Sequence, residues 1–155
     1  MLDQIPSPLD RETPTAYADR VGQWYSSVQA EDYRKKHGQF FTPIEVAKFM
    51  ARMVESNQTS VKILDPGAGT GILTCAVCER LASLPQKPHQ ITIHAYEQDS
   101  MLIIALRRVL NFLQGHLEAS GISTSIVVSN EDFVLKYGEC LFPSTPMLPS
   151  SVPPV

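Results

Sequence analysis

The sequence predicts an α/β fold, with a parallel sheet of about three strands preceded by an α-helical segment. Strand and helix patterns alternate between residues 61 and 135, as is typical of βαβ units. A glycine-rich turn, "DPGAGTG", directly follows the first strand pattern. Open doubly wound sheets usually contain more strands than this, so we expect an incomplete sheet, the front part of a larger domain.

Residues 1–60 form the predicted helical segment, in which two helices are expected. The first should bury one aromatic face, because apolar residues recur at helical spacing: Tyr17, Val21, Trp24 or Tyr25, and Val28. The second should start at Pro43, a residue suited to a first helical position, with Thr42 as its cap. Its apolar residues share one side: Val46, Phe49, Met50 and Met53.

Residues 61–135 contain the predicted strands, and residues 136–155 are read as a Pro/Ser-rich tail or linker. The strand "VKIL" is followed by a helix that ends before Pro85, and "ITIHAYEQD" is the second strand. A long amphipathic helix runs from Ser100 to about Ala119, and Gly121 is placed to cap it. The segment "TSIVVSNEDF" supplies the third strand.

Bulk composition limits the classes of function. The formal net charge is -3 and the pI is about 5.8, so no global basic surplus favours nucleic acid, and DNA contacts would need a local patch or another region. No apolar run reaches the roughly 18 residues of a membrane span, and no signal-peptide pattern opens the chain, so we expect a cytoplasmic protein without a membrane partner. Three cysteines argue against a disulfide framework.

The glycine turn is the strongest chemical signal. Gly67, Gly69 and Gly71 allow a tight turn and close approach of a ligand, and the next helix points free N–H groups at the same place. The G-x-G-x-G spacing and the preceding Asp65 disfavour a pyrophosphate and favour a zwitterionic cofactor. The alternative is a strand-to-helix turn that binds nothing.

Two further strand ends carry acidic residues. Glu97 is placed to accept hydrogen bonds from the cis hydroxyls of a ribose, although a strand-end Glu is often only solvated. Asp132 and Phe133 offer an acceptor for an adenine amino group and a ring to pack on the base; the alternative is a turn acid beside a core Phe. Three strand ends therefore converge on one nucleoside-shaped pocket.

The motifs "DPGAGTG", "AYEQD" and "NEDF", in this order, resemble those of the S-adenosylmethionine-dependent methyltransferases, which have a Rossmann-like fold. The preceding "GQFFTP" narrows the resemblance to the adenine-specific DNA methyltransferases of restriction-modification systems, over roughly residues 34–135. The resemblance implies S-adenosylmethionine as cofactor and a set of contact residues: Thr42 and Pro43 near the methionine end; Asp65, Gly67 and Gly69 beneath it; Glu97 on the ribose; Asp132 and Phe133 on the adenine. We place Phe40 and Phe41 between the helical segment and the cofactor crevice, with Phe41 as a further cofactor contact.

The catalytic motif of that family, an Asn or Asp followed by Pro-Pro and an aromatic residue, is not found. The Pro-Pro in "SVPPV" is flanked by valines, which offer neither an acceptor nor a ring, so no catalytic residue is assigned. We expect a chain that binds cofactor without turnover and contacts DNA through regions that are not in it. A non-catalytic binding or assembly module is the alternative; a protein or RNA methyltransferase would not predict "GQFFTP".

The remaining candidate motifs are interpreted as structural rather than functional. Cys75 and Cys78 lie within an apolar helix pattern without a second ligand pair, so no metal site is predicted. The basic run at residues 34–37 is read as a solvated helix end rather than a phosphate contact. As partners we expect DNA, a specificity or restriction subunit, and a second copy of the chain paired through the exposed sheet edge.

Overall fold

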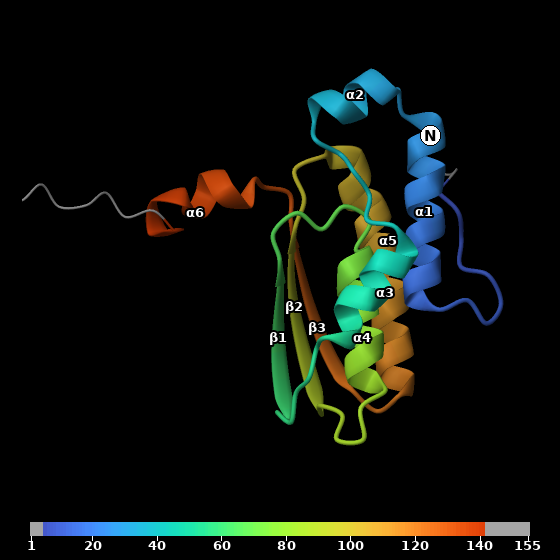
Figure 1. The fold of residues 1–155 in the computed structure, drawn as a ribbon, viewed down its shortest axis with the longest axis vertical. Coiled ribbons are helices and arrows are strands. Elements are labelled where there is room, and N and C mark those ends of the chain that lie inside the picture. Colours follow the sequence, from blue (N-terminus) through green and yellow to red (C-terminus); the bar gives the residue numbers. More distant parts are fainter. Residues whose placement is uncertain (1–4, 142–155) are drawn as a thin grey trace, which may run out of the picture.

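The computed structural model describes residues 5–141 as a three-stranded parallel sheet with helices packed on one face (Figure 1). The strands lie in the order β1-β2-β3, with every pairing parallel, which confirms the predicted α/β class. The elements are α1 (Pro14–Val28), α2 (Glu31–Lys36), α3 (Ile44–Arg52), β1 (Ser60–Asp65), α4 (Ile72–Ala82), β2 (Gln90–Tyr96), α5 (Ser100–Ala119), β3 (Ser123–Ser129) and α6 (Phe133–Leu141).

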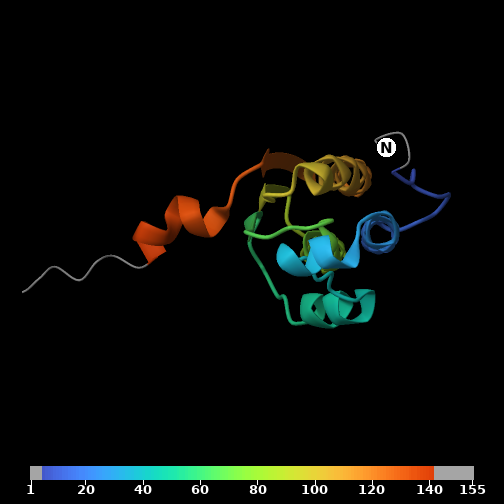
Figure 2. The same ribbon diagram turned by 90° about the horizontal axis from the view of Figure 1, so that it is seen from above.

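The two faces of the sheet differ in composition because side chains alternate along each strand. Ile63, Ile93 and Ile126 are register partners on the face toward the helices. Register partners on the opposite face include Lys62, Thr92 and Ser125. Within residues 5–141 no helix covers this second face, and α6 extends away from the end of the sheet (Figures 1 and 2). The polar side chains on this face suit its exposure, although Leu64 and Val127 on the same face are apolar and exposed.

Helix α5 has the predicted bounds and is held at both ends. The Asp99 carboxylate caps its first turn, accepting hydrogen bonds from the N–H groups of Met101 (2.8 Å) and Leu102 (2.9 Å). At the other end Gly121 has φ of +78°, and the Ile122 N–H donates to the Leu117 carbonyl at 3.0 Å, the pattern of a Schellman cap. The predicted apolar stripe is buried: Leu102, Leu106, Val109, Leu113 and Leu117.

Helix α1 joins the helical segment to the core. Tyr17, Val21 and Tyr25 are at most 1% exposed, as the helical spacing predicted, whereas Val28 at the end of the helix is exposed. The helix packs against α4 and α5. The predicted helical segment is therefore part of the same hydrophobic core as the sheet.

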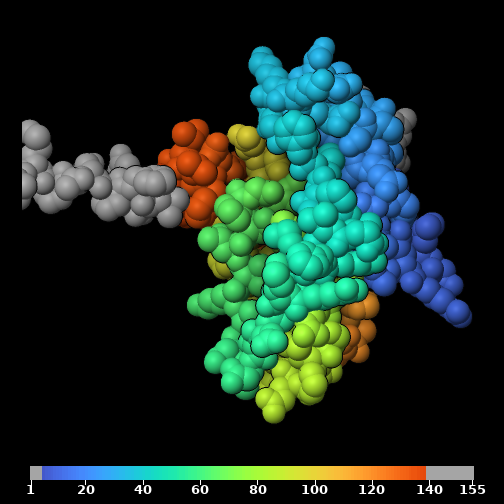
Figure 3. Space-filling model, viewed as in Figure 1, coloured from blue at the N-terminus to red at the C-terminus, as the bar shows by residue number. Residues whose placement is uncertain are grey.

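Helix α3 differs from expectation in its start and in its buried side. It begins at Ile44, and Pro43 is the capping residue, with an extended ψ of 144° and no side-chain cap; the prediction that Thr42 caps the helix is wrong. The buried residues are Ala47 and Ala51, whose small side chains allow α3 to lie close to α4. The outer surface of α3 lies at the front in Figure 3. It carries the exposed apolar residues Val46, Phe49 and Met50, and the exposed Met53 follows as the C-cap residue.

Helix α6 replaces an expected loop, and it crosses the boundary expected between residues 135 and 136. Asp132 caps it, because its carboxylate accepts a hydrogen bond from the Leu135 N–H at 3.0 Å. The predicted third strand ends earlier than its pattern, at Ser129. The rest of the expected Pro/Ser-rich tail, residues 142–155, lies outside the described residues.

We expect Gly71→Ala to destabilise the fold by more than about 2 kcal/mol, since a left-handed conformation costs a Cβ-bearing residue ~1–2 kcal/mol and overpacking adds ~1–3 kcal/mol. Gly71 has φ of +81°, and an added Cβ would lie 2.9 Å from Leu106 Cδ1. Gly115→Ala, on α5 with open space around it, is the matched control and should be neutral or stabilising. Urea unfolding of both variants makes the measurement; equal free energies of unfolding would contradict the packing described.

We expect Cys75 and Cys78 to resist thiol reagents in the folded protein. Burial raises the pKa of the Cys75 thiol well above its ordinary value and that of Cys78 to about 12, so both stay protonated at pH 8. The measurement is the rate of reaction with a chromogenic disulfide in a Cys140→Ser background, with and without denaturant. Rapid reaction without denaturant would show that α4 is not buried as described.

Candidate functional site

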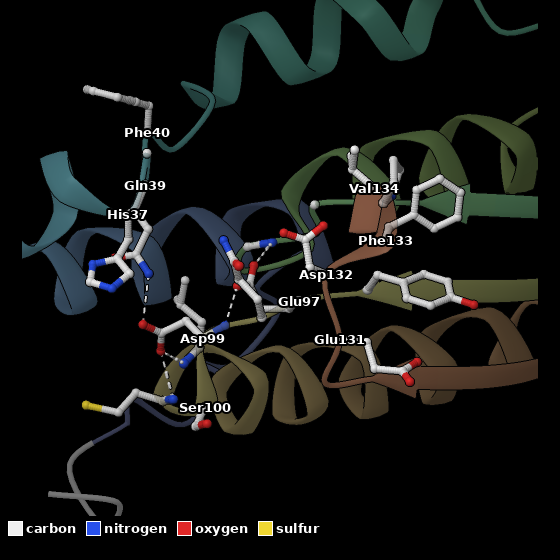
Figure 4. A pocket seen from close by; sticks show the side chains of 18 of the residues that line it. His37, Gln39, Phe40, Glu97, Asp99, Ser100, Glu131, Asp132, Phe133 and Val134 are labelled. Atoms are coloured by element: carbon white, nitrogen blue, oxygen red, sulfur yellow. Dashed lines mark hydrogen bonds between the residues drawn. The ribbon is translucent and has the colours of Figure 1, made fainter. Parts of the chain in front are cut away.

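The carboxyl ends of the strands and residues 33–41 enclose a cavity of about 540 Å³ (Figure 4). Several predicted contact residues line it: Phe41, Gly67, Gly69, Glu97, Asp132 and Phe133. They come from the glycine turn, the end of β2, the start of α6 and the segment before α3. Parallel strands bring these ends together, because their carboxyl termini share one edge of the sheet.

Glu97 is nearly buried and braces the glycine turn. One carboxylate oxygen accepts a hydrogen bond from the Gly69 N–H at 2.9 Å, and the other accepts from the Asp99 N–H at 2.8 Å. An ionised carboxylate has about four acceptor positions, so two backbone donors leave acceptor capacity on Glu97 for a ligand. Glu97 directly follows the last residue of β2, as predicted, and its assignment to the hydroxyls of a ribose stays a prediction.

Asp132 and Phe133 lie at the other side of the cavity, where aromatic rings gather. The Phe133 ring packs against Tyr96 at 5.1 Å and Tyr137 at 4.9 Å between centroids. The cap of α6 uses one oxygen of Asp132. The second oxygen, and the surface of Phe133 that lines the cavity, are the groups that a ligand can contact.

Phe41 separates this cavity from a smaller one of about 180 Å³. Its ring packs edge-on against Tyr25 at 5.7 Å and lies beside Gly22 and Gly69, where an added Cβ would approach the ring to 3.5–3.6 Å. The neighbouring Phe40 is 79% exposed and only borders the larger cavity. Of the two phenylalanines in "GQFFTP", therefore, it is Phe41 that packs into the structure.

Thr42 and Pro43 line the smaller cavity, together with residues of α1 and Thr70. Apart from Asp65, the predicted contact residues are thus divided between two adjacent cavities that share Phe41. Both cavities border the turn between β1 and α4, the smaller at Thr70 and Ile72 and the larger at Gly67 and Gly69.

Asp65 lies outside both cavities. It is a register partner of Ala95 on the helix-covered face, so its carboxylate meets α4 and accepts a hydrogen bond from the Thr74 hydroxyl at 2.6 Å. Burial raises the pKa of Asp65, while the hydrogen bonds from Thr74 and the Gly67 N–H act in the opposite direction. Asp65 therefore holds the start of the glycine turn against α4 rather than facing the cavity.

The residue that sequence reasoning missed is Asp99. It is 7% exposed, and one carboxylate oxygen accepts hydrogen bonds from Gln39 (2.9 Å), Tyr33 (2.9 Å) and Tyr25 (3.2 Å). Figure 4 shows the Gln39 side chain reaching the Asp99 carboxylate. An acid before an apolar helix signals a cap. No sequence pattern reveals its partners, which lie 60 to 74 residues earlier in the chain.

In the described part of the chain, residues 5–141, no cluster of three or more His, Cys, Asp or Glu side chains is arranged to hold a metal ion. None of its helices combines the length and hydropathy that crossing a bilayer requires.

The sequence is similar to those of known proteins. The sequence model of the family described as N-6 DNA Methylase matches residues 18–138. The chain is 36% identical over 98 residues to the type II methyltransferase M.BsuBI of Bacillus subtilis, which covers 63% of this chain and 18% of that protein. It is 33% identical over 78 residues to M.AccI of Acinetobacter calcoaceticus (50% and 13%) and 32% identical over 93 residues to M.PstI of Providencia stuartii (60% and 18%).

These matches have a limited extent: the chain spans less than a fifth of the length of each of these three relatives. The residues that the family model matches include the glycine turn, Glu97 and Asp132, together with all three strands. The family match covers most of the chain and agrees with the fold. The chain belongs to the N-6 DNA methylase family and is a part related to the DNA adenine methyltransferases.

Proposed function

We propose that this chain is the S-adenosylmethionine-binding, amino-terminal part of a DNA adenine N6-methyltransferase. The observation that carries the proposal is the meeting of the glycine turn, Glu97 and Asp132 around one cavity, each at the carboxyl end of a different strand. The family of the chain transfers methyl groups to DNA, and such transfer requires a methyl donor.

The residues present fit an adenosyl cofactor. The cavity volume of about 540 Å³ lies within the range of about 300–1,000 Å³ that small-molecule sites occupy. An added Cβ at Gly67 would meet nothing within 4 Å, so the backbone there is open to close approach. The free acceptor positions of Glu97 suit two hydroxyl donors, and those of Asp132 suit an amino group.

Each residue then has a defined task. Glu97 accepts hydrogen bonds from the ribose hydroxyls while it holds the Gly69 N–H, so one carboxylate couples the ligand to the turn. Asp132 accepts from the adenine amino group, and Phe133 packs on the base from its place against Tyr96. Phe41, Thr42 and Pro43 position the methionine end on the side of the smaller cavity.

When bound, S-adenosylmethionine would supply an electrophilic methyl group on its sulfonium. In-line attack by the adenine N6 nitrogen would form the N–CH3 bond as the S–CH3 bond breaks, with S-adenosylhomocysteine as the leaving group and loss of one proton from N6 to solvent. The chain contributes binding and orientation to this step. The groups that hold the target adenine would come from regions outside this chain, because its Pro-Pro pair, at residues 153–154, lacks the acceptor and ring that the chemistry requires and lies outside the described residues. The isolated chain should therefore bind cofactor without turnover.

The same valine-flanked Pro-Pro favours a second candidate, a non-catalytic module with a methyltransferase-like fold that serves in binding or assembly. Such a module has no need to retain cofactor affinity, so a cofactor titration separates the two.

As partners we propose DNA, contacted mainly through other regions, and a specificity or restriction subunit. A homodimer through a sheet edge is a further proposal, since β1 and β3 are both edge strands in the part of the chain described.

Glu97→Ala should weaken S-adenosylmethionine binding by at least about ten-fold, because hydrogen bonds to a charged acceptor contribute ~1.5–3 kcal/mol. The matched control is Glu131→Ala, which removes another carboxylate from the lining of the same cavity and should bind as the wild type does. Titration calorimetry measures both affinities, with circular dichroism to establish that each variant is folded. The absence of heat for the wild-type chain would overturn the proposed function; equal affinities for wild type and Glu97→Ala would remove Glu97 from the site.

Asp132→Asn should alter which base the cavity prefers. Asn still caps α6, but it presents an amide donor beside the base, so the variant should lose roughly ten-fold in its preference for S-adenosylhomocysteine over the analogue with a 6-carbonyl in place of the 6-amino group. Competitive titration with the two ligands measures the preference. Glu131→Gln makes the same change of charge at the neighbouring position and should leave the preference unaltered. An unchanged preference in Asp132→Asn would show that this carboxylate does not read the base.

A further inference from the structure

The segment from Glu31 to Phe41, which we call the wall segment, forms one side of the larger cavity through Tyr33, His37, Gly38, Gln39, Phe40 and Phe41. It comprises α2 and the loop that follows. Helix α2 has six residues and buries none of them. A helix this short with no buried face gains little from packing, so other contacts must hold the wall segment in place.

Phe41 packs against Tyr25 at one end of the wall segment, and the polar side-chain contacts to the rest of the protein converge on Asp99. Gln39 Nε2 and the Tyr33 hydroxyl each donate to Asp99 Oδ2 at 2.9 Å, and they come from the two ends of the wall segment. The Tyr25 hydroxyl of α1 lies 3.2 Å both from this oxygen and from Gln39 Oε1, so its single hydrogen is shared between them. The exposed stack of His37 on Tyr33, at 4.1 Å, is internal to the wall segment.

Asp99 is itself fixed from the other side. Its second oxygen caps α5, and its N–H donates to Glu97 at 2.8 Å. The carboxylate is therefore a joint between the wall segment, the first turn of α5 and the acid that we assign to the ribose. Burial of the carboxylate raises its pKa, but the hydrogen bonds from Leu102, Gln39, Tyr33 and Met101 outweigh that effect and lower it overall, so Asp99 is ionised at neutral pH.

We propose that Asp99 is a positioning residue that latches the wall segment against the cavity and thereby sets how long a bound cofactor is retained. This inference rests on the proposed function, because the retained ligand is S-adenosylmethionine. Asp99 acts through Gln39 and Tyr33, and release of these two hydrogen bonds is the opening step.

Asp99→Asn tests the latch separately from the cap of α5. The Asn oxygen can still cap α5, whereas its amide group places a donor against the Gln39 and Tyr33 donors. Tyr33→Phe is the second variant, since it removes one latch hydroxyl from an exposed residue and should leave folding intact. The matched control is Tyr137→Phe, which removes the hydroxyl that pairs with Tyr96 at the opposite end of the cavity and does not contact Asp99.

The experiment combines amide hydrogen exchange with the rate of S-adenosylmethionine dissociation, both on the full chain. We expect Asp99→Asn to speed exchange in residues 31–41 by at least about ten-fold, consistent with hydrogen bonds to a charged acceptor, while α5 stays protected. Dissociation should accelerate by a similar factor, with a smaller change in the association rate. Tyr33→Phe should show both effects in weaker form, and Tyr137→Phe should show neither.

The outcomes separate the latch from the site. No binding by the wild-type chain would overturn the proposed function and the retention role with it. Binding with unchanged exchange at residues 31–41 in Asp99→Asn and Tyr33→Phe would overturn the latch alone. Faster exchange with an unchanged dissociation rate would show that the wall segment is latched but does not retain the ligand, and would overturn the inference as stated.

Discussion

The structure depends on two carboxylates at the end of β2 that accept hydrogen bonds from widely separated parts of the chain. Glu97 holds the N–H of Gly69 in the glycine turn, and Asp99 holds the first turn of α5 together with Tyr25, Tyr33 and Gln39. The turn, the long helix and the helical segment before the sheet are thereby brought to one place. Burying such charges is costly, and the number of donors around each oxygen is what makes the burial tolerable.

This arrangement also separates structural from ligand-binding roles within the site. The oxygens of Asp99 are fully used by five donor groups of the protein, so its role is to position its neighbours. Glu97 has two backbone donors and retains acceptor capacity toward the cavity. Asp65 accepts a hydrogen bond from the Thr74 hydroxyl and so holds the start of the glycine turn against α4. Three acids near one crevice therefore do three different things, and their hydrogen-bond partners distinguish them.

The helices complete one side of the sheet and leave other apolar surface exposed. In the part of the chain described, Phe49 of α3 and Met53 at its C-cap are 63% and 65% exposed, while Ala47 and Ala51 of the same helix are buried. A hydrophobic pattern shows that a helix is amphipathic, but the side that packs is chosen by which residues allow the closest approach. In α3 the small alanine side chains are the buried ones, and the larger apolar side chains face outward.

Much of the fold was predictable from local patterns. The strand-helix alternation, the bounds of α5 and the Gly121 cap follow from periodicity and backbone preference, which the chain carries at each position. The same holds for the meeting of Gly67, Gly69, Glu97 and Asp132, since parallel strands bring their carboxyl ends to one edge. The start of α3 was missed by one residue, because Pro43 is extended in ψ and serves as the cap.

What the sequence by itself determined is therefore the order of the elements and the edge of the sheet at which the site forms. Only the tertiary structure decided that Asp99 binds Gln39 and Tyr33, that Asp65 faces α4, and that Phe41 rather than Phe40 packs against Tyr25. Caps and periods are set by neighbouring residues, so they can be read along the chain. The hydrogen-bond donors of a buried carboxylate are set by how distant segments pack against each other. The residues next to the carboxylate in the sequence do not indicate which donors these will be.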